Sequence, residues 1–261
     1  MCYNSRMANI QKKNNKAPRI INIDFDFQAE ANGRDSDRYS KTLQEYHRLL
    51  WSKQLPDGHI FQLTKVSNNR LYHKSDRGEF FLSSDRAVAT FAKWKRLEHV
   101  VSMVSKEKVE AFVHLSDTIG GIVIWPSNQI NNMPTINAER GFNKKIADRL
   151  DVTLECIRRY YLGEHSPLFD VINRYNEFFN LFGNFKNYID FFLLQDAVSE
   201  DYSKVKIALP FDNFNSLPVP LNVDEYCNYM ETTSQFIKKR NMRISSLKIR
   251  LQIDQEQNIA F

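Results

Sequence analysis

Two aspartates near the start of the chain could hold a metal ion. In IINIDFDFQ, residues 20–28, apolar and polar side chains alternate, which is typical of a β-strand with one buried face. Asp24 and Asp26 then lie on the polar face, about 6.5 Å apart along the strand. Carboxylate oxygens suit Mg²⁺ or Mn²⁺, so the pair is a candidate metal and catalytic site for an enzyme acting on nucleotides or nucleic acids.

A second stretch offers a simpler explanation of this pattern. SLKIRLQI, residues 246–253, also alternates and places Lys248 and Arg250 on its polar face. If the two strands are neighbours, cross-strand ion pairs with Asp24 and Asp26 account for both patterns without a ligand. Both interpretations stay open. We favour the solvated or ion-paired face, because pairs of charged residues on a protein surface seldom indicate a binding site.

The densest group of charged side chains lies in TINAERGFNKKIADRLDVTLECIRRYYLG, residues 135–163. Arg140, Arg158 and Arg159 offer planar guanidinium groups suited to phosphate, and Thr135 or Asn137 could cap a helix there. A phosphate-bearing ligand, either a nucleotide or RNA, is therefore one hypothesis. Acidic residues alternate with these arginines, which is equally typical of a salt-bridged helix face, and we favour that second interpretation.

The basic charge of the chain comes from one end. The formal net charge is +5, with 36 Lys and Arg against 31 Asp and Glu. Residues 1–19 contain five of the basic residues and no acidic one, so the remainder is formally neutral. The composition predicts a disordered basic tail over residues 1–19 rather than a basic binding face.

Missing motifs exclude several standard enzyme classes. The chain has no G-x-x-x-x-G-K-[ST], G-x-G-x-x-G, H-E-x-x-H or G-x-S-x-G. Its three cysteines, Cys2, Cys156 and Cys227, show no metal-ligand spacing, and we find neither a signal segment nor an apolar run long enough to span a membrane. We therefore expect a cytoplasmic protein that does not bind membranes, with its cofactor and protein partners unknown.

Hydrophobic periodicity predicts an α+β fold with a β-rich N-terminal half. We expect strands at residues 20–28, 59–66, 70–75, 79–84, 108–115 and 120–126, forming an antiparallel or mixed sheet. Helices are expected at residues 37–53, with His47 on the buried face, and at 84–97, with Ser84 or Asp85 near its cap. The β-rich part thus covers residues 20–126.

The second half is predicted to be mainly helical over residues 135–240, with a closing strand at 246–253. Because no linker rich in Gly, Ser or Pro separates the halves, we expect one α+β domain over residues 20–261.

The stretch NRLYHKSDRGEFFLSSDRAVATFAKW, residues 69–94, resembles the opening of ADP-ribosyltransferase-like folds. In those folds an aromatic–His strand, a second strand ending in Ser or Thr, and a helix cradle nicotinamide dinucleotide. The resemblance implies Tyr72 and Ser83 as cofactor-binding residues and His73 as a catalytic residue. The acidic motif that closes such sites has no clear counterpart downstream, so the resemblance is local.

The segments YHRLLWSKQLP, GEFFLSSD, TIGG and VTLECIRRYY give a broader resemblance. Together they are similar to a family of uncharacterised bacterial proteins, a domain of unknown function, over residues 22–200. This resemblance implies a bacterial or phage origin and one contiguous domain, and it brings no catalytic residues.

Two classes of function follow from these observations. The first is a protein that binds a phosphate-bearing ligand, with a role in phage–host conflict as one context. The second is an enzyme, either metal-dependent or dependent on nicotinamide dinucleotide. They differ in whether polar groups from distant segments converge in one pocket.

Overall fold

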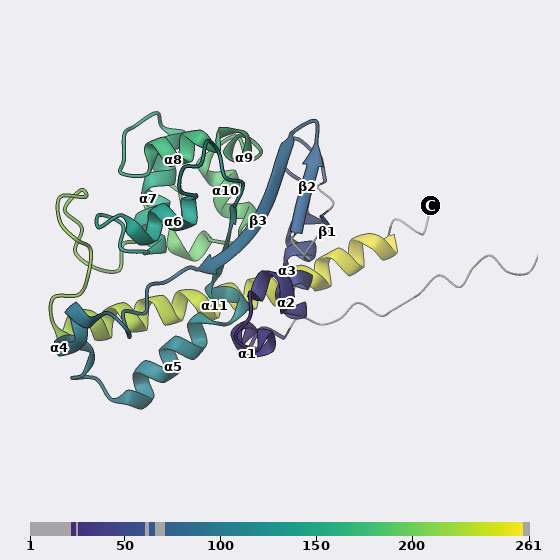
Figure 1. The fold of residues 1–261 in the computed structure, drawn as a ribbon. Helices are drawn as coiled ribbons and strands as arrows, with labels where there is room; N and C mark the ends of the chain where they lie inside the picture. The colour runs from purple at the N-terminus through teal and green to yellow at the C-terminus, as the bar shows by residue number, and fades with distance from the viewer. Residues whose placement is uncertain (1–21, 25, 61–62, 66–70, 258–261) are drawn as a thin grey trace, which may run out of the picture.

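A computed structural model describes residues 22–24, 26–60, 63–65 and 71–257 (Figure 1). The predicted basic tail, residues 1–19, lies outside the described residues. Helices make up the larger share of the described chain, and the strands form one antiparallel sheet. The predicted α+β class is therefore confirmed. The N-terminal half is not β-rich, because several helices lie before and between its strands.

The four strands pair in chain order: β1 Thr64–Lys65, β2 Leu71–Ser75, β3 Gly78–Arg86 and β4 Ile122–Pro126. The hairpin expected from residues 70–75 and 79–84 is confirmed, as is the strand at 120–126. The strand expected at 59–66 is described only as β1 and an isolated bridge at Ile60.

The register of the sheet decides which side chains share a face. His73 pairs with Phe80, and Ser84 pairs with Ile124. Because side chains alternate along a strand, Ser84 and Arg86 lie on one face of β3 and Asp85 lies on the other. The side chains of the last three residues of β3 therefore point toward two different parts of the protein.

Within the described residues, three short helices precede the sheet: α1 Phe27–Ala31, α2 Ser36–Tyr39 and α3 Lys41–Trp51. The carboxylate of Asp26 accepts hydrogen bonds from the backbone N–H groups of Gln28 and Ala29 and so caps α1. The strand expected over residues 20–28 is thus wrong in its described part, since these local capping bonds start a helix there. Ser40 caps α3, where the sequence offers Asp37 or Ser40 for this role.

Two further predictions fail between β3 and β4. The helix expected at 84–97 is wrong because Ser84–Arg86 continue the pairing with β4 and Phe91 adopts a left-handed conformation (φ 58°), which breaks a helix. At the end of this range the 3-10 helix η2 Lys95–Leu97 forms, and α4 Glu98–Val101 follows it. The strand expected at 108–115 is helix α5 Lys106–Ser116, whose buried residues recur at helical spacing.

The helical second half is confirmed by five helices: α6 Ile136–Phe142, α7 Leu150–Tyr161, α8 Phe169–Arg174, α9 Asn176–Asn180 and α10 Phe185–Phe191. Aromatic rings join this half to the first. Trp51 of α3 packs edge-to-face against Phe178 and lies 5.2 Å, centroid to centroid, from Phe191. Such pairs add about 0.5–1.5 kcal/mol each beyond the apolar area that they bury.

The long helix α11 Val223–Gln257 crosses the molecule (Figure 1). It continues through residues 246–253, so the predicted closing strand is wrong. The proposed cross-strand pairing of Lys248 and Arg250 with Asp24 and Asp26 is therefore wrong as well.

Arg240 and Asn241 attach α11 to the segment before β4: the Asn241 side-chain oxygen accepts from the Gly120 N–H at 2.6 Å. A Cβ at Gly120 would meet the Ile237 carbonyl oxygen at 2.4 Å, so TIGG is a close-packing motif.

Candidate functional site

A polar cavity of about 400 Å³ lies where α1 and α2 meet the end of β3. Its volume is within the range of small-molecule sites, about 300–1,000 Å³. Polar and charged residues dominate its wall: Gln28, Arg34, Asp35, Ser36, Asp37, Ser84, Asp85 and Arg86, with Phe27, Leu43 and Ile122 as the apolar members. Segments distant in sequence therefore bring polar groups together here.

Ser84, His47 and Asp37 form a hydrogen-bonded group at this cavity. The Nε2 atom of His47, a fully buried side chain of α3, lies 2.6 Å from the Ser84 hydroxyl oxygen. Both carboxylate oxygens of Asp37 accept from the Ser84 backbone N–H, at 2.9 and 3.1 Å. The same Nε2 atom lies 3.6 Å from Asp37 Oδ1. The backbone and side chain of Ser84 are thus both held in place.

Two arginines of the cavity keep N–H groups available for a ligand. Arg86 binds Asp117 through Nε and Nη2, at 2.6 and 2.7 Å, which leaves Nη1 without a partner among the described residues. Arg34 is exposed and stacks on the Tyr39 ring, 4.0 Å from the centroid. Its Nε donates to the Ala31 carbonyl, and no carboxylate of the described chain lies within 4.0 Å of it. Both guanidinium groups can therefore accept an anion.

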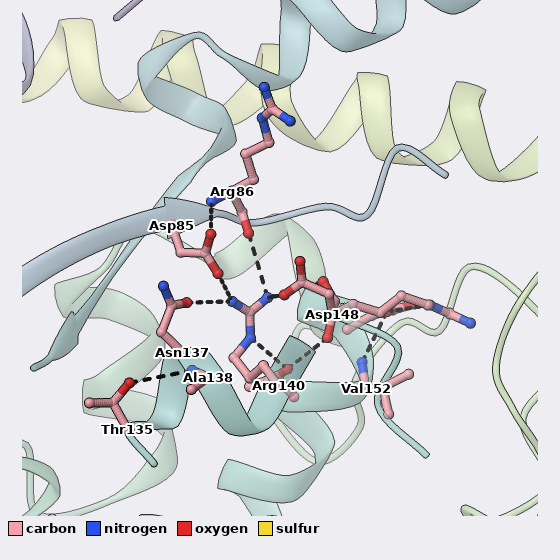
Figure 2. Close-up of polar contacts among 11 residues, drawn as sticks. Asp85, Arg86, Thr135, Asn137, Ala138, Arg140, Asp148 and Val152 are labelled. Atoms are coloured by element: carbon pink, nitrogen blue, oxygen red, sulfur yellow. Dashed lines mark hydrogen bonds and ion pairs between the residues drawn. The ribbon is translucent and has the colours of Figure 1, made fainter. Parts of the chain in front are cut away.

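The opposite face of β3 binds a buried arginine (Figure 2). Figure 2 shows the Asp85 side chain directed toward Arg140, whereas the Arg86 side chain leaves the strand in the other direction. Arg140 Nη1 lies 2.6 Å from Asp85 Oδ2, and Nη2 lies 3.4 Å from Asp148 Oδ1. Its Nε donates to the Thr153 hydroxyl. All three nitrogens of Arg140 are thus occupied.

Burial governs the titration of the carboxyls around Arg140 and Arg86. It raises the pKa of Asp148 to about 6, against the lowering effect of Arg140. It also raises the pKa of Asp85 and of Asp117, although each carboxyl contacts an arginine. The cost of desolvating these charges therefore exceeds the gain from their partners.

The predicted metal pair lies outside this cavity. Asp26 caps α1, and its Oδ2 lies 3.3 Å from His114 Nδ1. Asp24 is exposed and lines a separate groove beside α5 and α11. No cluster of three or more His, Cys, Asp or Glu side chains suited to a metal occurs in the part of the chain that the structure describes. A metal at Asp24 and Asp26 stays a prediction.

The residues of the dinucleotide prediction lie on two faces of the sheet. Tyr72 pairs with Phe81, so Tyr72 and Ser83 share one face, and His73 lies on the other. The His73 side chain is buried against Phe80, and its Nε2 lies 3.0 Å from the Ser75 hydroxyl. The structure therefore does not bring His73 together with Tyr72 and Ser83, and none of the three lines the polar cavity.

The arginines predicted to bind phosphate all contact carboxylates. Arg158 binds both oxygens of Glu155 at 2.8 and 2.9 Å, and Arg159 Nε lies 2.8 Å from the same side chain. Arg140 is fully buried in the network described above. These contacts are those of the salt-bridged helix face that the alternating charges of the sequence favour, while a phosphate role for these residues stays a prediction.

Sequence reasoning missed Arg34, Asp37, Ser84 and Arg86 as a site. A signal was present in SSDR, residues 83–86, where polar residues follow the apolar part of a strand. Ser and Asp are also common helix caps, so the same residues predict the start of a helix. NGRDSD, residues 32–37, contains cavity-lining residues from outside β3, but its composition is typical of a turn.

Comparisons with known proteins identify the family of the chain, but they assign no catalytic or binding residues to it. A model described as a family of unknown function (DUF6994) matches residues 21–244. The chain therefore belongs to this family, as its sequence resemblance implied. No curated protein and no solved structure matches it. Across the described helices, none combines the length and the apolar character that crossing a membrane requires.

Proposed function

We propose that the protein binds a small phosphate-bearing ligand, a nucleotide or a sugar phosphate, in the cavity at the end of β3. The observation that carries this proposal is the convergence of Arg34 and Arg86 on one polar cavity of about 400 Å³, each with guanidinium N–H groups that no described residue accepts. Charge-assisted hydrogen bonds from arginine to phosphate are among the strongest polar contacts in proteins.

The charges of the cavity favour a ligand that carries both an anion and hydroxyl groups. Asp35 and Asp85 are paired with Arg38 and Arg140, at 2.9 and 2.6 Å, so neither opposes an incoming anion fully. Asp37 has no arginine or lysine within 4.0 Å among the described residues. It can accept hydrogen bonds from hydroxyl groups, such as those of a ribose, while the arginines bind the phosphate.

The number of arginines and the size of the cavity narrow the ligand further. Two guanidinium groups favour the phosphate dianion over a single carboxylate, because a phosphate monoester carries nearly two negative charges at neutral pH. The volume suits one nucleotide or sugar phosphate better than an RNA strand, which needs an extended groove with bases stacked along it.

Isothermal titration calorimetry tests this proposal. The probes are inorganic phosphate, ribose 5-phosphate and AMP, with adenosine and glycine as controls that lack a phosphate. We expect ribose 5-phosphate or AMP to bind, and adenosine and glycine not to bind. Because the charge of phosphate drives the interaction, the affinity should fall as salt is added.

Two variants locate the binding site. Arg34→Gln should weaken binding about tenfold or more, which is the value of one charge-assisted hydrogen bond, and its exposed position leaves the fold intact. Arg158→Gln is the matched control on the α7 face. If Arg158→Gln lost affinity and Arg34→Gln did not, the phosphate would bind at α7, and the proposal would be overturned.

A further inference from the structure

The direction of the hydrogen bond between Ser84 and His47 determines what the cavity can recognise. Either Nε2 donates its proton to the Ser84 oxygen, or the Ser84 hydroxyl donates to Nε2. In the first case the hydroxyl proton is free to bind a ligand. In the second case the serine is arranged as a nucleophile whose proton histidine removes. Ligand binding by the Ser84 hydroxyl therefore requires a proton on Nε2, whereas covalent catalysis requires Nε2 to be free of a proton.

The second nitrogen of His47 decides between these arrangements. The Nδ1 atom is buried and has no hydrogen-bond partner among the described residues. A neutral imidazole carries one proton, so a proton-free Nε2 would place an N–H group at Nδ1 with nothing to accept it. Among backbone groups, buried N–H groups without a partner are rarer than buried carbonyl oxygens without one, and we expect the same order for the ring nitrogens of His47. This favours the proton on Nε2.

The carboxylate of Asp37 favours the same tautomer. Its Oδ1 lies 3.6 Å from Nε2, so a proton on that nitrogen is attracted to the carboxylate, whereas a lone pair there is repelled. Asp37 also fixes the Ser84 backbone through the two contacts at 2.9 and 3.1 Å. His47 and Asp37 together leave the cavity as the direction open to the Ser84 hydroxyl proton.

We infer that Ser84 is a hydrogen-bond donor for the ligand and that His47 is the positioning residue that sets this direction. The inference rests on the proposed function and deepens it. The ligand group beside Ser84 must be an acceptor, for which a non-bridging phosphoryl oxygen is suited. With its proton on Nε2, His47 cannot act as the base for Ser84, so the site binds its phosphate ligand rather than forming a phosphoserine.

Nitrogen-15 NMR reads the tautomer directly and needs no ligand. Long-range correlation spectra of protein with labelled histidine, recorded near pH 8, distinguish a protonated from an unprotonated ring nitrogen. The His47 signals are assigned as those that disappear in His47→Gln. We expect Nε2 to carry the proton. A proton on Nδ1 would overturn the inference and leave Ser84 arranged as a nucleophile.

A pair of Ser84 variants tests the hydroxyl in the same titrations. Ser84→Ala should bind ribose 5-phosphate about ten- to a hundredfold more weakly, as for loss of a donor to a charged group, whereas Ser84→Thr keeps the hydroxyl and should bind within a few-fold of wild type. Urea unfolding confirms that each variant is folded.

The outcomes separate this inference from the proposed function. Equal binding by wild type and Ser84→Ala would overturn the inference and leave the proposed function standing. If no phosphate probe binds the wild type, the proposed function fails, and with it the acceptor assigned to the ligand. The NMR result still decides the direction of the Ser84–His47 hydrogen bond in that case.

Discussion

Arginines occupy two contrasting environments around β3 and β4. Arg140 and Arg240 are fully buried, and every nitrogen of each has a protein acceptor. Arg34 and Arg86 lie at the polar cavity and keep N–H groups that no described residue accepts. A cluster of arginines in a sequence therefore does not indicate a ligand site until the hydrogen-bond acceptors of each arginine within the protein are known.

The two buried arginines also differ from each other. Arg140 has Asp85 and Asp148 as counter-charges. Arg240 has no carboxylate within 4.0 Å in the described chain and instead donates to backbone carbonyls of Gly120, Ile122 and Phe192 and to the Tyr46 hydroxyl. Burial lowers the pKa of Arg240. Its role is to join α11 to α3, to the segment before β4 and to the end of α10.

Replacing Arg240 should give the largest effect and would sharpen the contrast between buried and cavity arginines. Arg240→Met leaves three carbonyl oxygens and the Tyr46 hydroxyl without their donor, and we expect a loss of about 3–5 kcal/mol in the free energy of unfolding. Urea unfolding measures it. The control is Arg243→Met on the same helix, whose exposed ion pair with Asp196 should be worth less than about 1 kcal/mol. Equal losses in the two variants would contradict a structural role specific to Arg240.

A smaller effect, dependent on pH, tests the network of Arg140. Burial raises the pKa of Asp148 to about 6 from the ordinary 3.8. A carboxyl whose pKa is higher in the folded state contributes stability below its unfolded pKa, and that contribution is lost as the pH rises through about 6. Asp148→Asn should therefore gain stability relative to wild type between about pH 4 and pH 7.

Unfolding curves at several pH values check this expectation. Asp170→Asn, which replaces an exposed aspartate of α8, is the control for removing a carboxylate elsewhere in the protein. A difference between wild type and Asp148→Asn that is independent of pH would show that Asp148 titrates as an ordinary surface group.

The smallest effect concerns the aspartates outside the cavity. Asp26→Ala removes the cap of α1 and should cost about 1 kcal/mol, whereas Asp24→Ala should change stability by less than about 0.5 kcal/mol. Thermal unfolding with and without Mg²⁺ or Mn²⁺ completes the test. A metal that stabilises the wild type and neither variant would restore the metal site to these residues and weaken the case for the cavity.

Much of the fold could be predicted from local patterns. Helix α3 has a regular apolar face and a serine cap, and the β2–β3 hairpin has turn residues between two short strands, so both are readable. Alternation gave a wrong prediction in the described part of residues 20–28, where Asp26 caps a helix, and at 246–253, where the strand-like pattern is part of α11. Residues 108–115 fit either period, and their packing decides in favour of helix.

The candidate site could not be predicted in the same way. Asp37, His47 and Ser84 meet only because α2 and α3 pack on the end of β3, and no spacing in the sequence encodes that contact. Arg140, by contrast, was conspicuous in sequence and is fully buried. Residue type indicates what chemistry is available, whereas tertiary packing decides which groups remain available for it.

The contrast between cavity and buried arginines is tested most directly by NMR of the arginine side chains during a titration with ribose 5-phosphate. Each Nε–H signal is assigned by its loss in an Arg→Lys variant. We predict that the signals of Arg34 and Arg86 shift as the ligand is added and that those of Arg140 and Arg240 stay in place. Shifts confined to Arg158 and Arg159, or no shift at any arginine, would contradict a phosphate site at the end of β3.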